Sequence, residues 1–222
     1  IVTKHIPGRD SIGLAIWVRV GGRYEQKSLS GISHFVEHML FKGTKRRTTK
    51  RIKEDVEGVG GMLNAFTGEE STCYFVKIQR SYFRQAFDVL QDMLNDAVLK
   101  TAEFQKEQTV ILEEIKMYLD LPSQYVHEVM NELLWPAQAL GRPIAGTLET
   151  VSHLKRNDLW RHVQAYYHPR NMLITACGEI NHAEIRELSE TYFSNGYKRS
   201  VSQYEKAKVS SNSASDRFRF ID

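Results

Sequence analysis

One short motif constrains this chain more than any other feature of it. Residues 34–38 read His-Phe-Val-Glu-His, the pattern H-x-x-E-H, within a run from 29 to 41 that suits a helix. Because each helical residue advances about 100°, His34, Glu37 and His38 fall within an arc of roughly 100°. Apolar residues fill the opposite arc. We therefore predict an amphipathic helix with two imidazoles and one carboxylate on its polar side.

The motif alone leaves two interpretations open. Two neutral histidines one helical turn apart can bind one Zn²⁺ at about 2.0–2.1 Å, and the carboxylate beside them can take a proton from a metal-bound water. This order is the inverse of the zinc-protease motif H-E-x-x-H. Alternatively, the three residues form a surface cluster or satisfied polar groups in the core, since so short a pattern recurs by chance. A third ligand elsewhere would favour the zinc site.

Composition and charge narrow the class of protein. The 222 residues, 41% hydrophobic and 26% charged, are typical of a soluble globular protein with one large or two small domains. The net charge of +3 is too small to indicate a nucleic-acid partner. No apolar run approaches the roughly 20 residues of a membrane span. We interpret the basic residues 45–51 as a solvated loop and helix start rather than a binding patch.

The two cysteines bear on metal binding and on compartment. Cys73 and Cys177 are far apart and lack C-x-x-C spacing, so a zinc site must come from histidines and acidic residues. No motif supports a disulfide between them, which favours a reducing compartment, and we expect the cytoplasm. The chain starts at Ile1 rather than Met, so we expect it to have been processed or trimmed. An organellar matrix and the periplasm therefore stay open.

Hydrophobic periodicity predicts one α+β domain over residues 1–195. Residues 1–6 and 11–20 are predicted to form a hairpin, because a Pro-Gly turn signal separates them. Further strands are expected at 62–67, 72–79 and 171–177, and further helices at 50–59, 82–99, 102–119, 125–134, 157–167 and 182–193. The polar, Ser-rich composition of residues 196–222 predicts a linker that leads into a second, missing domain.

The predicted helix 102–119 offers candidates for the third ligand. With Glu107 set at zero and each residue advancing about 100°, Glu114 lies at about 340° and Glu113 at about 240°. A broad apolar face between about 280° and 80° contains Phe104, Val110, Ile111, Ile115, Met117 and Tyr118. We therefore expect Glu107 and Glu114 to point inward and Glu113 to be solvated.

Inward carboxylates are costly unless they are paired, hydrogen-bonded or bound to a metal. One interpretation pairs Glu107 and Glu114 with buried Arg or Lys, or rotates the helix so that both are less buried. The other makes one acid the third ligand, while the second orients a ligand or the water. The remaining six histidines lack a partner at ligand spacing, and we expect them to be ordinary surface or capping residues.

Several motifs together resemble those of one peptidase family. The motif at 34–38 followed by Glu107 and Glu114 is similar to the inverted-zincin metallopeptidases of the pitrilysin and mitochondrial processing peptidase family. In that family the third ligand follows at a spacing similar to the 76 residues (114 − 38) found here, and another glutamate precedes it by seven, as Glu107 does (114 − 107). The segment Asn64-Ala65-Phe66-Thr67 also matches, as do both flanks of the motif. The resemblance covers nearly all of residues 1–195.

The resemblance implies a fold and a site. The fold would be one half of a processing-peptidase-type enzyme, with a mostly antiparallel sheet covered by several helices. His34, His38 and Glu114 would bind Zn²⁺, Glu37 would be the general base, and Glu107 would support the site from behind. Residues Asn64, Ala65 and Phe66 would form an edge strand that pairs with the substrate backbone.

The implied activity is that of a zinc endopeptidase acting on unfolded peptides or leader sequences. Family members usually carry two or more homologous halves, and this chain resembles only the N-terminal, catalytic one. The implied partner is a C-terminal half or a partner subunit of the same family, and a homodimer is also open. The alternative is a zinc-binding but inactive fragment, or a peptide-binding subunit that needs such a partner. A third interpretation is a chance motif in a structural protein.

Overall fold

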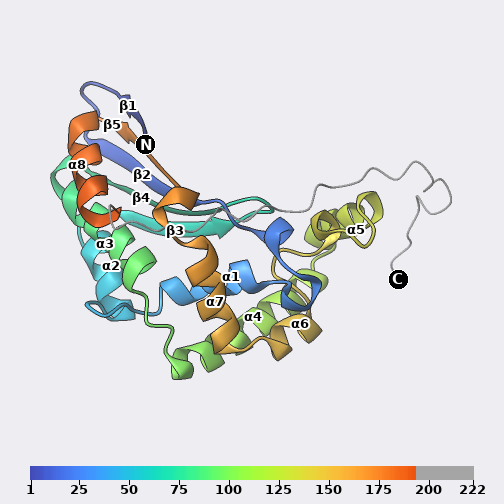
Figure 1. Ribbon diagram of the computed structural model, residues 1–222. Helices are drawn as coiled ribbons and strands as arrows, with labels where there is room; N and C mark the ends of the chain where they lie inside the picture. Colours follow the sequence, from blue (N-terminus) through green and yellow to red (C-terminus); the bar gives the residue numbers. More distant parts are fainter. Residues whose placement is uncertain (194–222) are drawn as a thin grey trace.

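The computed structural model describes residues 1–193, which form a five-stranded sheet and eight α-helices (Figure 1). The strands are β1 (Val2–His5), β2 (Ser11–Val18), β3 (Met62–Thr67), β4 (Thr72–Gln79) and β5 (Met172–Gly178). They lie in the order β1-β5-β2-β4-β3, and every neighbouring pair except β1 with β5 is antiparallel. The predicted α+β class with a mostly antiparallel sheet is therefore confirmed. The predicted linker at 196–222 lies outside the described residues.

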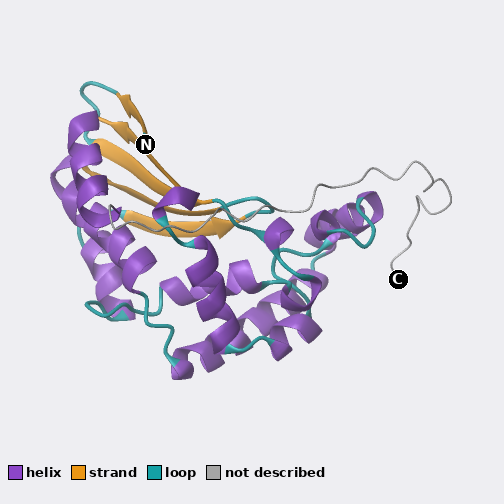
Figure 2. Cartoon of the chain, viewed as in Figure 1, coloured by secondary structure: helices purple, strands orange, loops and turns teal. Residues whose placement is uncertain are grey.

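The helices lie on one face of the sheet, and α5 projects away from it (Figure 2). They are α1 (Ile32–Leu40), α2 (Thr49–Glu57), α3 (Phe83–Asp96), α4 (Thr101–Leu119), α5 (Pro122–Leu134), α6 (Leu148–His153), α7 (Arg156–Tyr166) and α8 (His182–Phe193). Of these, α6 had not been predicted. The core forms between sheet and helices because the strands alternate in burial: the four even residues of β2, from Ile12 to Val18, are at most 1% exposed.

The predicted hairpin between residues 1–6 and 11–20 is wrong. Strand β1 pairs in parallel with β5, with Val2 opposite Thr175, and β5 lies between β1 and β2. Three of the four residues of β1 are exposed, which suits an edge strand, whereas β5 buries Ile174 and Ala176 and pairs on both sides. A local turn signal cannot show that a distant strand inserts between two neighbours.

The basic stretch after α1 is partly buried, contrary to the prediction of a solvated loop. The side chain of Arg47 is 12% exposed and forms ion pairs with Asp55, Asp88 and Asp92 at 2.9, 2.5 and 2.6 Å. The side chain of Asp92 is fully buried. Because Asp55 belongs to α2 and the other two acids to α3, this network joins the loop after the motif helix to both helices.

We predict that Arg47→Met lowers the free energy of unfolding by about 3 kcal/mol, because it removes the buried cation that the three carboxylates share. Asp55 then keeps only Arg51, and Asp88 and Asp92 keep only Arg46, and both of these arginines are at least 50% exposed. The matched control is Lys45→Met, since Lys45 pairs only with Asp96 at the surface. Urea unfolding of both variants measures the difference. An equal loss in the two variants would show that the network does not support the fold.

A buried histidine lies behind the motif helix. His162 of α7 is 7% exposed, its Nε2 lies 3.3 Å from the Ser33 hydroxyl of α1, and burial lowers its pKa to about 3. The unfolded chain, in which a histidine has a pKa of about 6.5, therefore binds the proton first as pH falls. The stability that depends on neutral His162 is thus present above pH 6.5 and is lost as pH falls toward 3.

From pH 6.5 to 5, we predict that the wild type loses about 2 kcal/mol more stability than His162→Leu, because one pKa unit corresponds to about 1.36 kcal/mol. His127→Leu, on the exposed side of α5, should keep the wild-type pH dependence. Urea unfolding at several pH values measures these slopes. The assignment fails if His162→Leu retains the wild-type slope.

Candidate metal centre

Helix α1 carries the motif with the predicted phase. Its apolar residues are 0–1% exposed, and they are Ile32, Phe35, Val36, Met39 and Leu40. The opposite side bears His34, Glu37 and His38, which are only partly buried. Helix α1 packs against α4 and strand β3, so these three polar side chains come close to residues of both elements.

Helix α4 brings Glu114 to the two histidines. The Nε2 atom of His34 lies 3.9 Å from Oε1 of Glu114, and Nε2 of His38 lies 3.6 Å from Oε2. One ligand atom of each residue lies within 4.8 Å of the others. Tetrahedral zinc with bonds near 2.1 Å holds its ligand atoms about 3.4 Å apart, so small side-chain shifts suffice. Two histidines and a glutamate fit a catalytic zinc with one open position.

The electrostatics of His34 suit a metal ligand. Burial, followed by the neighbouring charge of His38, lowers the pKa of His34 to about 4 although Glu114 opposes the shift. The ring is therefore neutral at pH 7, which is the form that binds metals. Its Nδ1 is buried and has no hydrogen-bond partner among the described residues.

The buried face of α4 is rotated from the predicted one. Val110 and Met117, predicted on the apolar face, are 49% and 50% exposed. The buried residues Phe104, Ile111 and Ile115 centre the face near about 60° from Glu107, rather than near zero. The broad apolar pattern extended past the contact with α1, so periodicity alone overestimated the buried width.

The rotation places the two inward acids differently. Glu107 is 5% exposed and lies inside, whereas Glu114 lies at the edge of the buried face with its side chain 22% exposed. The predicted contrast with Glu113 is confirmed: its side chain is 65% exposed and pairs with Lys116 at 2.7 Å. A carboxylate at the edge of a buried face can reach both the histidines and a substrate.

Glu107 is held between a cation and an imidazole. Its Oε1 forms an ion pair with Lys42 Nζ at 2.7 Å, and its Oε2 lies 3.2 Å from Nδ1 of His38. Glu107 therefore pairs with a lysine, as the first interpretation of an inward carboxylate expects, and it also lies within hydrogen-bonding distance of a motif histidine. When Nδ1 of His38 donates to Glu107, Nε2 keeps its lone pair toward Glu114.

Glu37 faces the same space from α1. The hydroxyl of Thr67, the last residue of β3, donates a hydrogen bond to Oε2 of Glu37. Burial raises the pKa of Glu37, while the Thr67 hydrogen bond and His38 oppose that rise. The other carboxylate oxygen, Oε1, can accept a proton from a reacting group.

Three supporting side chains had not been predicted as part of the site. Lys42 and Tyr118 each follow a site residue by four positions, and the Tyr118 hydroxyl donates to Oε1 of Glu114 at 3.0 Å. The i, i+4 spacing on one helix face could have identified Tyr118, whereas Lys42 lies two residues past the end of α1. Thr67 is 30 residues from Glu37 on another element, and no local signal links them.

The predicted substrate segment forms the edge of the sheet beside the site. Asn64, Ala65 and Phe66 lie on β3, which pairs only with β4 among the described strands. The Ala65 N–H donates to Oδ1 of Asn64 at 2.8 Å. A cavity of about 310 Å³ lies between β3, α1 and α2, and its lining includes Glu37, His38, Lys42, Asn64 and Glu107.

Comparison with known proteins gives a consistent family. Residues 1–148 match the family model of insulinase, peptidase family M16, and residues 153–220 match that of the peptidase M16 inactive domain. A protein named as a zinc protease, YmxG of Bacillus subtilis, is 36% identical over 192 residues, which are 86% of this chain and 47% of the relative. The probable mitochondrial-processing peptidase subunit beta of Arabidopsis thaliana is 34% identical over 81% of this chain and 34% of the relative.

Solved structures share the fold. A protease from Helicobacter pylori has a TM-score of 0.85 at 22% identity and covers 93% of this chain and 50% of that chain. The periplasmic protease PqqL from Escherichia coli has a TM-score of 0.82 at 25% identity and covers 93% and 24%. Within residues 1–193, no helix combines the length and the apolar character that a membrane crossing requires.

These matches identify the family of the chain and show how much of its relatives' length the chain spans. The chain spans about half the length of the curated relatives it matches, 47%, 40% and 50% for three bacterial zinc proteases. The resemblance that the motifs had indicated is confirmed. The chain belongs to the insulinase family of peptidases, family M16.

Proposed function

We propose that this chain is the zinc-binding half of an endopeptidase that hydrolyses unfolded peptides or leader sequences. The observation that carries the proposal is the convergence of His34, His38 and Glu114, with Glu37 beside them. Membership of a peptidase family with relatives named as zinc proteases supports it. The three convergent residues would hold Zn²⁺ and leave one position open.

The chemistry follows from the partners of each side chain. When bound, zinc supplies a Lewis acid that polarises the scissile carbonyl and lowers the pKa of a water. Glu37 accepts a proton from the attacking water and returns it to the leaving amine. Thr67 occupies one of its oxygens, so the other is the acceptor. Glu107 and Tyr118 hold His38 and Glu114 in place.

The edge strand β3 supports a polypeptide substrate. An extended peptide can add to the free edge of the segment Asn64, Ala65 and Phe66, beside the site, through the main-chain groups of this segment that face away from β4. The Ala65 N–H, which the Asn64 side chain now satisfies, would be one donor. Because such pairing depends little on sequence and needs an extended strand, it favours unfolded substrates.

We also propose that a second half of the same family completes the enzyme, as a C-terminal continuation or a partner subunit. Residues 1–195 would be the catalytic domain, and 196–222 would lead to that half. The length of the relatives supports this. The outer face of the sheet supports it too, because Val2, Met62, Phe66 and Leu173 are 58%, 47%, 47% and 42% exposed on it. Val2 and Met62 also line a hollow of about 600 Å³ on this face. Exposed apolar patches of this kind mark interfaces. A homodimer through this face is the alternative.

A second candidate function is a zinc-binding but inactive fragment, or a peptide-binding subunit that depends on a partner chain. Its support is the same half-length. The free cysteines Cys73 and Cys177 support a reducing compartment such as the cytoplasm for either candidate.

Three variants test the site. Glu37→Gln should keep zinc but lower turnover of an unstructured peptide by about 10²–10⁴-fold, since only the base is removed. Glu114→Ala should lose zinc, whereas the matched control Glu113→Ala should retain it. The measurements are zinc content after dialysis and peptide cleavage. Metal loss in Glu113→Ala but not in Glu114→Ala would refute the proposed ligand set, and zinc uptake without cleavage in the wild type would favour the second candidate.

A further inference from the structure

The motif helix has no cap of its own. Its N-cap residue is Gly31, whose φ of 92° is left-handed and which has no side chain to accept a hydrogen bond. A Cβ atom at Gly31 would lie 2.5 Å from the carbonyl oxygen of Ala145, so only glycine fits against that loop. The first backbone N–H groups of α1 therefore need acceptors from elsewhere.

Glu25 supplies those acceptors. Its Oε2 accepts from the N–H of Gly31 and its Oε1 from the N–H of Ser33, each at 2.8 Å. The Ser33 hydroxyl lies 3.3 Å from Nε2 of His162 in α7. Glu25 is 7% exposed, so these bonds are shielded from water. Burial raises the pKa of Glu25 to about 7, and the hydrogen bonds from the Ser33 and Gly31 backbone oppose that rise.

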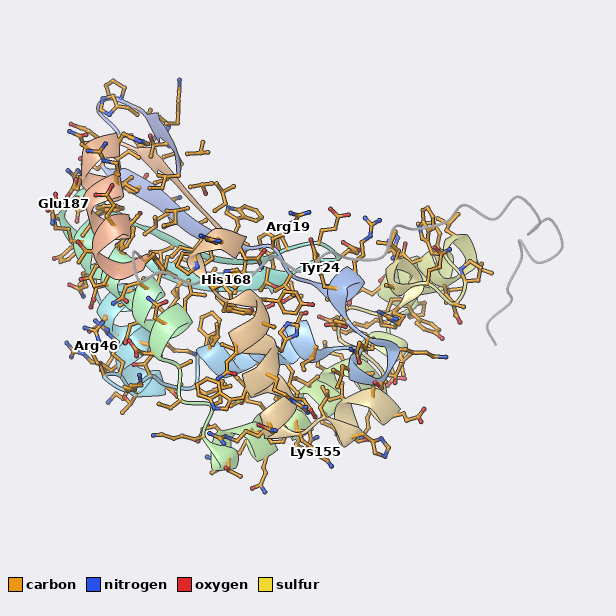
Figure 3. All side chains as sticks on the ribbon, in the orientation of Figure 1. Arg19, Tyr24, Arg46, Lys155, His168 and Glu187 are labelled. Atoms are coloured by element: carbon orange, nitrogen blue, oxygen red, sulfur yellow. The ribbon has the colours of Figure 1, made fainter. Side chains whose placement is uncertain are left out.

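The segment that carries Glu25 is itself fixed. The preceding Tyr24 accepts a hydrogen bond from Arg19 Nε at 3.0 Å, and the two residues lie near one another in Figure 3. The Tyr24 ring packs edge-on against the Tyr166 ring of α7, with 5.9 Å between the ring centroids. Arg142 donates to the backbone carbonyl of Glu25 at 2.5 Å. Glu25 therefore connects the start of α1 to a segment that also contacts α7 and Arg142.

The two histidines of the motif differ in how they are held. The His38 ring is hydrogen-bonded to Glu107 through Nδ1, whereas Nδ1 of His34 has no partner among the described residues. The direction of the His34 ring therefore depends on its packing against the His38 ring, at 4.6 Å between centroids, and on the backbone that carries it. The residue before His34 is Ser33, whose backbone N–H donates to the Glu25 carboxylate.

We propose that Glu25 is a positioning residue for the metal centre: it fixes the first turn of α1 and thereby the orientation of His34. This inference rests on the proposed zinc site. It assigns Glu25 no contact with metal or substrate.

The test compares zinc affinity with stability. Glu25→Gln keeps the size of the side chain but replaces one acceptor oxygen with an NH₂ group, which cannot accept from a backbone N–H. Zinc affinity, measured by competition with a chromogenic chelator, should fall about 10–100-fold, as for other residues that orient ligands. The matched control is Asp55→Asn. Asp55 is another buried acid, it lies in α2, and it pairs with Arg47 and Arg51. This substitution should lower stability in urea and leave zinc affinity unchanged.

The outcomes separate this inference from the proposed function. Wild-type affinity in Glu25→Gln, or an equal loss in Asp55→Asn, would overturn the role of Glu25. A wild type that takes up no zinc would overturn the metal site itself. Amide hydrogen exchange at residues 31–34 of the zinc-free chain tests separately whether Glu25 fixes the first turn of α1. Unchanged protection of these amides in Glu25→Gln would exclude that role. If that variant does not fold, Glu25→Asp, which is one methylene too short to reach both N–H groups, replaces it.

Discussion

The contact between α1 and α4 is the constraint on which the candidate site depends. It places two imidazoles, from one helix, against two carboxylates from the other, in a space that is only partly open to water. Such groups cannot be buried without partners, because each charge or lone pair would lose its hydration. Here Glu107 is satisfied by Lys42 and His38, while Glu114 at the edge of the contact has Tyr118 and the two histidines. One acid therefore stabilises the contact and the other stays available for a ligand.

The rest of the fold holds that contact at the edge of the sheet. The core between sheet and helices fixes α1 from beneath, α7 supports it through Ser33 and His162, and Glu25 fixes its start. Strand β3 then brings a free edge and Thr67 to the same place. The polar side of α1 consequently faces both a strand edge with free main-chain groups and an acidic helix, and the proposed endopeptidase would use both.

Sequence reasoning predicted the parts of this arrangement that depend on local periodicity. The phase of α1 and the contrast between Glu113 and Glu114 followed from about 100° per residue, because both helices bury one face. The width of the buried face of α4 and the pairing of the strands were harder to predict. Val110 and Met117 continue the apolar pattern of α4 beyond its contact, and β5 separates two strands that a turn signal had joined. Thr67 and Glu25 reach α1 across tertiary contacts, and no spacing in the sequence indicates them.

The proposed site consists of two histidines and Glu114 around one zinc ion with an open position. X-ray absorption spectroscopy at the zinc edge of the zinc-loaded 222-residue chain measures these ligands. We expect four light ligands, two of them imidazoles, with bond lengths of about 2.0–2.2 Å, and loss of this signature in Glu114→Ala. A sulfur ligand near 2.3 Å, or an unchanged spectrum in Glu114→Ala, would contradict the proposed site.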